Sequence, residues 1–168
     1  MSATKSVVNL AVGRLLTTGA IESLDTPVHR WYPEWNAGRK AQVTLRHLLS
    51  HTSGLHADRT TEAIYASPDF VRHALDSEVT SDPGTVFFYN NSATNLVAGI
   101  VGRAAGRPMD EFLRDDLFAK LGITDFTWTR DRAGNPHGMA GLQILPRDLA
   151  RLGQLVLDGG VCNDEQLI

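Results

Sequence analysis

Ser2 and Lys5 are the residues whose types and spacing best fit covalent chemistry. They stand three positions apart at the start of an apolar-periodic run that predicts a helix, so both side chains lie on one helical face. A serine in the first turn lies at the positive end of the helix dipole, which favours negative charge on its oxygen. A lysine one turn later can accept the hydroxyl proton. The pair is the Ser-x-x-Lys arrangement of acyl-transfer enzymes.

A second motif, Tyr89-Asn90-Asn91, supplies the further proton-handling group that a lysine base needs. Tyr89 precedes a predicted helix, at the mouth of a loop from which a side chain can reach a cleft. Its phenol can relay a proton to a leaving group, and the Asn91 amide can hold Lys5 or a substrate carbonyl by hydrogen bonds. The chain contains one Ser-x-x-Lys and one Tyr-x-Asn sequence.

Each of these residues also has an ordinary structural interpretation. Ser2 and Lys5 would then be a cap serine and an exposed lysine in a first helical turn. Tyr89 would be a core tyrosine, and Asn91 would be the N-cap of the next helix, a role compatible with substrate contact.

Other candidate residues favour structural roles. His47 and His51 are four apart, but Leu48 stands where a zinc motif has glutamate and no third ligand is evident, so we expect structural histidines. Ser53 lacks a glycine two positions earlier and is therefore no nucleophile elbow. We expect Trp31, Trp35 and Trp128 to be core or cleft-wall aromatics. Asp148 and Arg151 are expected to form an ion pair on a helix surface.

The composition is that of an ordinary globular chain. Its 168 residues indicate one domain or part of one, with 42% hydrophobic and 21% charged residues. The net charge of −3 gives no basis for nucleic acid or an acidic membrane surface as partner. The single cysteine, Cys162, excludes an internal disulfide and a cysteine-built metal cluster. No apolar run reaches the length of a membrane span.

The apolar pattern predicts a mainly helical chain with little strand. Expected helices are 5–18, closed by Gly19; 45–50, capped by Thr44; 69–76, with Pro68 at the first position; from Asn91 or Ser92 to 105; 108–120, closed by Gly122; and 146–157. Short strands are expected at 85–89 and 124–130. Met1 leads directly into Ser2 without a strand or signal peptide, and 164–168 opens a further element, so we expect a chain interrupted at both ends.

The chain resembles the serine β-lactamase and penicillin-binding-protein family, in the branch of class C β-lactamases, D-alanyl-D-alanine carboxypeptidases and related esterases. The resemblance covers nearly the whole chain and rests on several motifs that stand in the family's order. They are Ser2-x-x-Lys5, 45–55 (Leu-Arg-His-Leu-Leu-Ser-His-Thr-Ser-Gly-Leu), Pro83-Gly84-Thr85 leading into Tyr89-x-Asn91, 138–142 and 146–153. It implies that Ser2 is the acylated nucleophile, with its backbone N–H in the oxyanion hole, and Lys5 its general base. Tyr89 would be the acid or base partner, and Asn91 a substrate-amide contact.

The family's third motif, Lys-Thr-Gly or His-x-Gly on a strand, is missing. Lys120-Leu121-Gly122 has the spacing but falls at a predicted helix end. The resemblance therefore implies an α+β, β-lactamase/transpeptidase-like fold of which residues 1–168 hold the nucleophile helix and the helical domain, with little of the antiparallel sheet.

The resulting prediction is a serine hydrolase that acts through an acyl-enzyme on Ser2. Its partner would be a small-molecule ester, amide, D-alanyl peptide or β-lactam, with an ester or a non-β-lactam amide preferred, and no metal or organic cofactor is implied. The alternative is a catalytically silent truncated domain or binding module of the same fold. Exposed strand edges and unburied apolar helix faces also predict self-association. The residues indicate no compartment.

Overall fold

Helices are the main regular element of the computed structural model, which describes residues 2–58 and 60–168. The α-helices are α1 (Ala3–Thr17), α2 (Leu45–Leu49), α3 (Glu62–Ala66), α4 (Phe70–Asp76), α5 (Asn91–Ala105), α6 (Met109–Leu113) and α7 (Pro146–Leu157). Short helical turns are η1 (Val28–Arg30), η2 (Pro33–Trp35), η3 (Gly38–Gln42), η4 (Arg114–Phe118) and η5 (Ala119–Leu121). None of the helices in the described part is both long and apolar enough to cross a bilayer.

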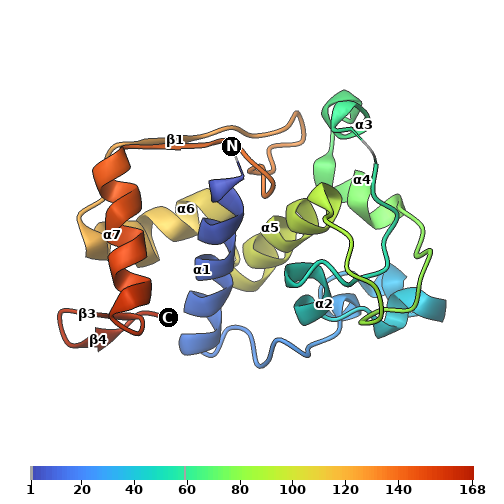
Figure 1. Ribbon diagram of the computed structural model, residues 1–168, viewed down its shortest axis with the longest axis horizontal. Helices are drawn as coiled ribbons and strands as arrows, with labels where there is room; N and C mark the ends of the chain where they lie inside the picture. Colours follow the sequence, from blue (N-terminus) through green and yellow to red (C-terminus); the bar gives the residue numbers. More distant parts are fainter. Residues whose placement is uncertain (1, 59) are drawn as a thin grey trace.

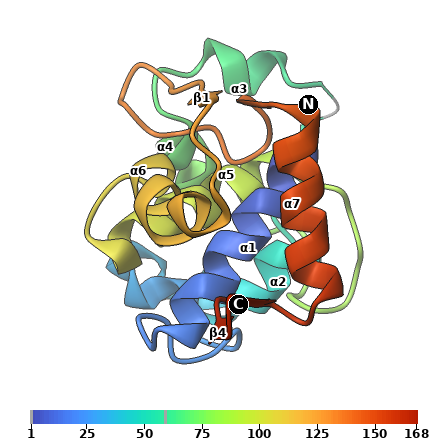
Figure 2. The same cartoon turned by 90° about the vertical axis from the view of Figure 1, so that its left-hand side faces the viewer.

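Helices α1 and α5 form the centre of the molecule (Figures 1 and 2). The apolar stripe of α1, including Val8, Ala11 and Leu15, is buried, as its spacing predicts. It packs against α5, whose Leu96 and Ile100 are also buried, and α5 packs in turn against α2 and α4. Burial of each such leucine or isoleucine contributes about 1.5–3 kcal/mol, so this contact fixes where α1 presents its first turn.

The strands form two antiparallel pairs in the described residues. β1 (Phe126–Trp128) pairs with β2 (Leu142–Ile144), with Thr127 opposite Gln143. β3 (Val161–Cys162) pairs with β4 (Glu165–Gln166) near the end of the chain. The α+β prediction of a helical domain with little sheet is confirmed.

The first helix and α4 begin at other residues than the sequence predicts. α1 begins at Ala3 rather than Lys5, and α4 begins at Phe70 with Asp69 as its N-cap. The Asp69 carboxylate accepts a hydrogen bond from the Arg72 N–H at 2.8 Å, which satisfies a free donor of the first turn. Pro68 therefore precedes the helix, and its expected place inside the first turn was wrong.

Two other predicted elements are not formed as expected. Residues 85–89 are irregular rather than a strand, and Val86, Phe87 and Phe88 are exposed. The predicted helix 108–120 is divided into α6, a π-helical turn (η4) and a 3₁₀ turn (η5). It ends at Gly122, as predicted, where φ is +65° and favours glycine.

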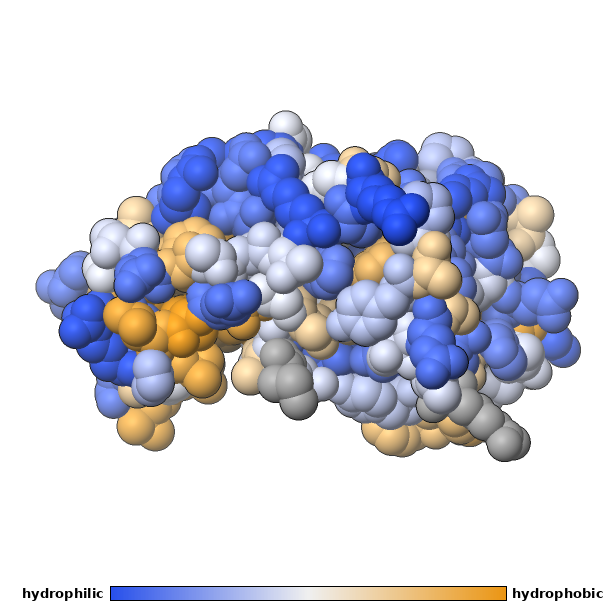
Figure 3. All heavy atoms as spheres, turned by 90° about the horizontal axis from the view of Figure 1, so that it is seen from above, coloured by the Kyte–Doolittle hydropathy of each residue, from blue (hydrophilic) through white to orange (hydrophobic). Residues whose placement is uncertain are grey.

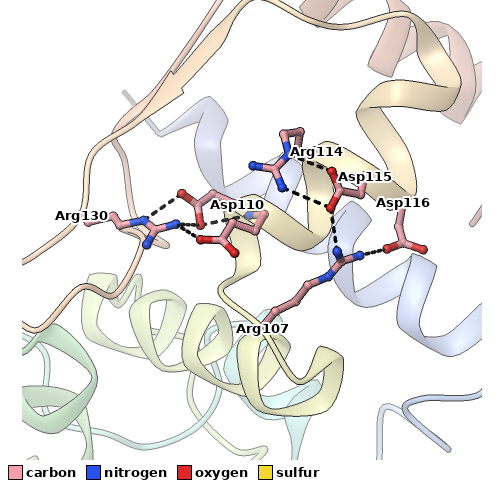
Figure 4. Close-up of polar contacts among 7 residues, drawn as sticks. Arg107, Asp110, Arg114, Asp115, Asp116 and Arg130 are labelled. Carbon is pink, nitrogen blue, oxygen red and sulfur yellow. Dashed lines mark hydrogen bonds and ion pairs between the residues drawn. The ribbon is translucent and has the colours of Figure 1, made fainter.

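Ion pairs join α6 to the segment that follows β1, and η4 to the turn that precedes α6 (Figure 4). Arg130 donates to Asp110 and Glu111, both at 2.8 Å, and Arg107 bridges Asp115 and Asp116. These groups are partly exposed, so each pair contributes at most about 1 kcal/mol.

Asp148 and Arg151 form an ion pair near the start of α7. Arg151 Nη1 donates to Asp148 Oδ1 at 2.8 Å, as the spacing predicts, and to the Gly122 carbonyl at 2.9 Å. The Asp148 carboxylate is buried, however, so the expectation of a surface pair was wrong for Asp148.

Candidate functional site

The first turn of α1 presents Ser2 to solvent. Ser2 is the N-cap residue, but its side chain makes no capping hydrogen bond. Its Oγ instead accepts a hydrogen bond from the Tyr89 hydroxyl at 3.1 Å. The interpretation of Ser2 as a simple cap therefore fails, and its hydroxyl is available to react.

Lys5 is buried, with a relative exposure of 9%, and does not extend into solvent. Its Nζ donates to the Met139 carbonyl oxygen at 2.8 Å and lies 4.9 Å from the centroid of the Tyr89 ring. Ser2, Lys5 and Tyr89, which the sequence predicts as one constellation, thus meet at the start of α1.

Tyr89 is 46% exposed and is not a core residue. Its ring packs on His51, with centroids 4.8 Å apart. Burial acts to raise the pKa of the phenol, but the interactions with the Lys5 ammonium and the Ser2 hydroxyl outweigh it, and the net pKa lies below its usual value of 10.0. A lowered pKa increases the fraction of Tyr89 in the phenolate form, which is the form that can accept a proton.

His51 contacts the ring of Tyr89 and the backbone of Asn90. Its Nδ1 accepts a hydrogen bond from the Asn90 N–H at 3.2 Å, so the neutral ring carries its proton on Nε2. Burial, followed by the charge of Lys5, lowers the pKa of His51. The neutral ring therefore lies against Tyr89 without adding a second positive charge.

His47 has the structural role that its spacing predicts. Its Nδ1 accepts from the Thr44 N–H and completes a capping box at α2. No cluster of three or more metal-ligating side chains is present in the described part of the chain.

Asn91 is the first residue of α5, and Asn90 is the N-cap. The Asn90 side chain accepts from the Ala93 N–H at 2.9 Å and donates to the Leu55 carbonyl at 3.0 Å. The expectation that Asn91 or Ser92 caps this helix was wrong, because Asn90 has the extended backbone that a cap requires. Asn91 is half-buried, and the Lys5 hydrogen bond it was expected to supply comes from Met139 instead.

The segment 137–142 (the strap) is the part of the site that the sequence did not reveal. It joins α5 to α1: the Gly138 and Met139 N–H groups donate to Asn95 Oδ1, and the Leu142 N–H donates to Thr4 Oγ1 at 3.3 Å. The resemblance included 138–142 without a role for them. Asn95 gave no separate signal in the sequence, because it follows the polar residues Asn91, Ser92 and Thr94.

Two hollows lie on the surface near these elements. One of about 610 Å³ is lined by His51, Leu55, Val86 and Phe88, among others, and shares His51 with the site. The other, of about 560 Å³, lies between α4, α5 and α6. Neither hollow is lined by Ser2, Lys5 or Tyr89, and the first adjoins them through His51, which packs on Tyr89.

Comparison with known proteins places this arrangement in a family. The sequence profile described as beta-lactamase matches residues 1–167, almost the whole chain. The chain belongs to the β-lactamase family. Penicillin-binding-protein and esterase relatives support the same assignment.

The individual relatives of this β-lactamase-family chain differ in described activity. Esterase EstB of Burkholderia gladioli is 30% identical over 144 residues, which cover 74% of the chain and 36% of EstB. A candidate β-lactamase of Bacteroides dorei, known from its crystal structure, matches with a TM-score of 0.84 and 25% identity over 99% of the chain and 52% of its own. The octameric penicillin-binding protein homologue of Pyrococcus abyssi has the same fold, with a TM-score of 0.78 and 24% identity over 99% of the chain and 45% of its own. The chain thus spans about half the length of these solved structures and little more than a third of EstB.

Proposed function

We propose that Ser2, Lys5 and Tyr89 are the acyl-transfer centre of a serine hydrolase that acts on esters or amides. The observation that carries the proposal is the hydrogen bond between the Tyr89 hydroxyl and Ser2 Oγ, with Lys5 Nζ over the same phenol ring. A nucleophile beside a base that is itself held by a third group is the arrangement that covalent catalysis requires. The family membership supports the same reaction class.

The proposed reaction has two steps. Tyr89 reacts as the phenolate, which the Lys5 ammonium stabilises after the hydroxyl proton has left to solvent. Ser2 Oγ then bonds to the substrate carbonyl carbon, whose oxygen becomes an oxyanion, while the Ser2 proton passes to the Tyr89 oxygen. The carbon–heteroatom bond then breaks and the proton goes to the leaving alcohol or amine. A water molecule next attacks the acyl-enzyme, which releases the carboxylic acid and returns a proton to Ser2.

The remaining groups would bind the substrate. The Ser2 N–H is not needed for helix hydrogen bonding, so it would serve as one oxyanion donor. Asn91 would contact the substrate amide or carbonyl. The hollow lined by Leu55, Val86 and Phe88 would receive an apolar acyl or alcohol group, which favours a small ester or a non-β-lactam amide over a β-lactam.

Residues 1–168 are proposed to be a partial domain: the nucleophile helix and the helical part, with the flanking sheet segments outside them. The greater length of the relatives supports this division. Lys120 does not substitute for the missing third motif. It pairs with Glu165, which also contacts Arg14 at the opposite end of α1 from Ser2.

Intact-mass labelling with a fluorophosphonate tests the nucleophile. We expect one adduct on the wild-type chain, no adduct on Ser2→Ala and strongly slowed labelling of Lys5→Ala. Ser6→Ala is the matched control, because Ser6 is exposed on the next turn of α1. A folded wild-type chain without label would contradict the proposal and indicate a silent domain. Hydrolysis of p-nitrophenyl esters compared with a chromogenic cephalosporin then tests the preference for esters.

A further inference from the structure

Asn95 is a buried polar residue that the proposed reaction does not use. It lies on α5, six residues after Tyr89, and is 1% exposed. Its Oδ1 accepts two hydrogen bonds, from the Gly138 N–H at 2.9 Å and the Met139 N–H at 3.0 Å. Because both partners are donors, the amide oxygen faces the strap and the amide nitrogen points away from it.

The amide nitrogen of Asn95 is itself unsatisfied. Asn95 Nδ2 is buried and has no hydrogen-bond acceptor among residues 2–58 and 60–168. Leaving such a donor unpaired costs stability, so packing alone does not account for an asparagine at this position. The contribution of Asn95 to the fold is therefore the pair of hydrogen bonds that its Oδ1 accepts from the strap.

These two bonds fix the peptide planes that directly precede the Met139 carbonyl. The strap is pressed closely onto α5 here, because a Cβ at Gly138 would lie 2.1 Å from the Thr94 carbonyl oxygen. The Met139 carbonyl in turn accepts the hydrogen bond from Lys5 Nζ at 2.8 Å. A continuous chain of contacts therefore runs from Asn95 through the strap to Lys5.

We propose that Asn95 is a positioning residue: by holding the Gly138 and Met139 N–H groups it directs the Met139 carbonyl at Lys5, and so keeps the ammonium beside Tyr89. This proposal rests on the proposed function for its catalytic consequence. Its structural content, that Asn95 sets the position of Lys5, can be tested separately.

The structural test measures how accessible the Lys5 amine is. The chain has three lysines, so Lys40 and Lys120 act as internal references in pulsed acetylation followed by peptide mass spectrometry. In Asn95→Leu, which keeps the volume but removes the acceptor, we expect Lys5 acetylation to accelerate several-fold relative to the references. In Asn95→Asp, which keeps an oxygen for both donors, we expect the wild-type rate.

The catalytic test measures fluorophosphonate labelling of Ser2 in the same variants. We expect labelling to slow by roughly ten- to a hundredfold in Asn95→Leu, the effect of a misplaced catalytic group, and to be restored in Asn95→Asp. Leu96→Ala is the control for stability, since Leu96 is buried in the apolar core on the same helix and its side chain can offer the strap no hydrogen bond. It should lower the melting temperature without changing Lys5 acetylation.

The outcomes separate the two proposals. Unchanged Lys5 acetylation in a folded Asn95→Leu, or equal defects in Asn95→Leu and Asn95→Asp, would overturn the positioning role. If Asn95→Leu does not fold, Asn95→Ala, which also removes the acceptor, takes its place under the same criteria. Changed Lys5 acetylation with no Ser2 labelling in any variant would support the positioning role and contradict the hydrolase.

Discussion

The Tyr89 hydroxyl lies 3.1 Å from Ser2 Oγ, although the two residues are 87 positions apart in the chain. The contact exists because α5 packs along α1 and the chain enters α5 directly after Tyr89. The α1–α5 core is therefore also what holds the two hydroxyl groups of the proposed centre together.

Removal of the Tyr89 hydroxyl should impair the reaction without unfolding the chain. Tyr89→Phe keeps the ring on His51 and beneath Lys5, but it removes the proton relay, so we expect acylation of Ser2 to slow by about 10²–10⁴-fold. The measurement is the second-order rate of fluorophosphonate labelling. Tyr65→Phe is the control, because Tyr65 is an exposed tyrosine of α3. A Tyr89→Phe chain labelled as fast as wild type would exclude the relay.

The stability of the chain should fall in mild acid because of His51. Its pKa is lowered in the folded state, so the unfolded chain binds the proton more tightly. The part of the unfolding free energy that depends on His51 is thus fully present above the unfolded pKa of about 6.5. It is lost as the pH falls through that value toward the folded pKa, by at most about 1.4 kcal/mol per pH unit. His137, whose pKa is lowered chiefly by burial, adds a loss of the same sign.

Denaturant unfolding of wild type and His51→Asn at about pH 7.5 and about pH 5 measures this effect. Asparagine tolerates the positive φ of +58° at this position and offers an oxygen to the Asn90 N–H. We expect a smaller difference in unfolding free energy between the two pH values for the variant. An identical difference in both proteins would show that His51 does not titrate on unfolding.

Gly138→Ala should destabilise the strap. The added Cβ would meet the Thr94 carbonyl oxygen at 2.1 Å, and the opposing atom is helical backbone that cannot move aside cheaply. We expect a loss of about 2 kcal/mol or more in the free energy of unfolding, together with slower Ser2 labelling. Chemical denaturation measures the first and mass spectrometry the second.

Gly153→Ala is the matched control for Gly138→Ala. Gly153 lies within α7, and a Cβ there meets nothing within 4 Å. Alanine should therefore stabilise the helix by about 0.5–1 kcal/mol. Similar effects of both substitutions would mean that the close approach at Gly138 is relaxed in solution.

Self-association should depend on α7. Val156 and Leu157, the last residues of α7, are 57% and 79% exposed. Figure 3, seen from the side where α7 begins, shows other apolar side chains at the same end of the molecule. We expect the wild-type sedimentation coefficient to rise with concentration and that of Val156→Lys/Leu157→Gln to stay constant. Phe87→Ser, at a different exposed apolar site, should associate like wild type. If only Phe87→Ser becomes monomeric, the 86–89 segment is the contact instead.

The sequence predicted those parts of the fold that local rules control. Apolar spacing identified α1, α5 and α7, and Gly122 closed its helical segment as expected, because periodicity and a left-handed backbone are local properties. The division of residues 108–120 into three kinds of helical turn was not predictable. It depends on which side chains the core accepts, and here Leu117 and Phe118 are both buried.

The sequence by itself determined the identity of the proposed centre: Ser2 and Lys5 share a face because helical spacing requires it, and Tyr89 follows from its place before a helix. Only the tertiary structure decided what surrounds them. The strap, Asn95 and His51 reach the site through contacts between elements distant in the chain, and no local pattern encodes such contacts. Packing of α5 against α1 therefore turned two short motifs into one arrangement in which Lys5 is held by a backbone carbonyl, Met139, that no motif contains.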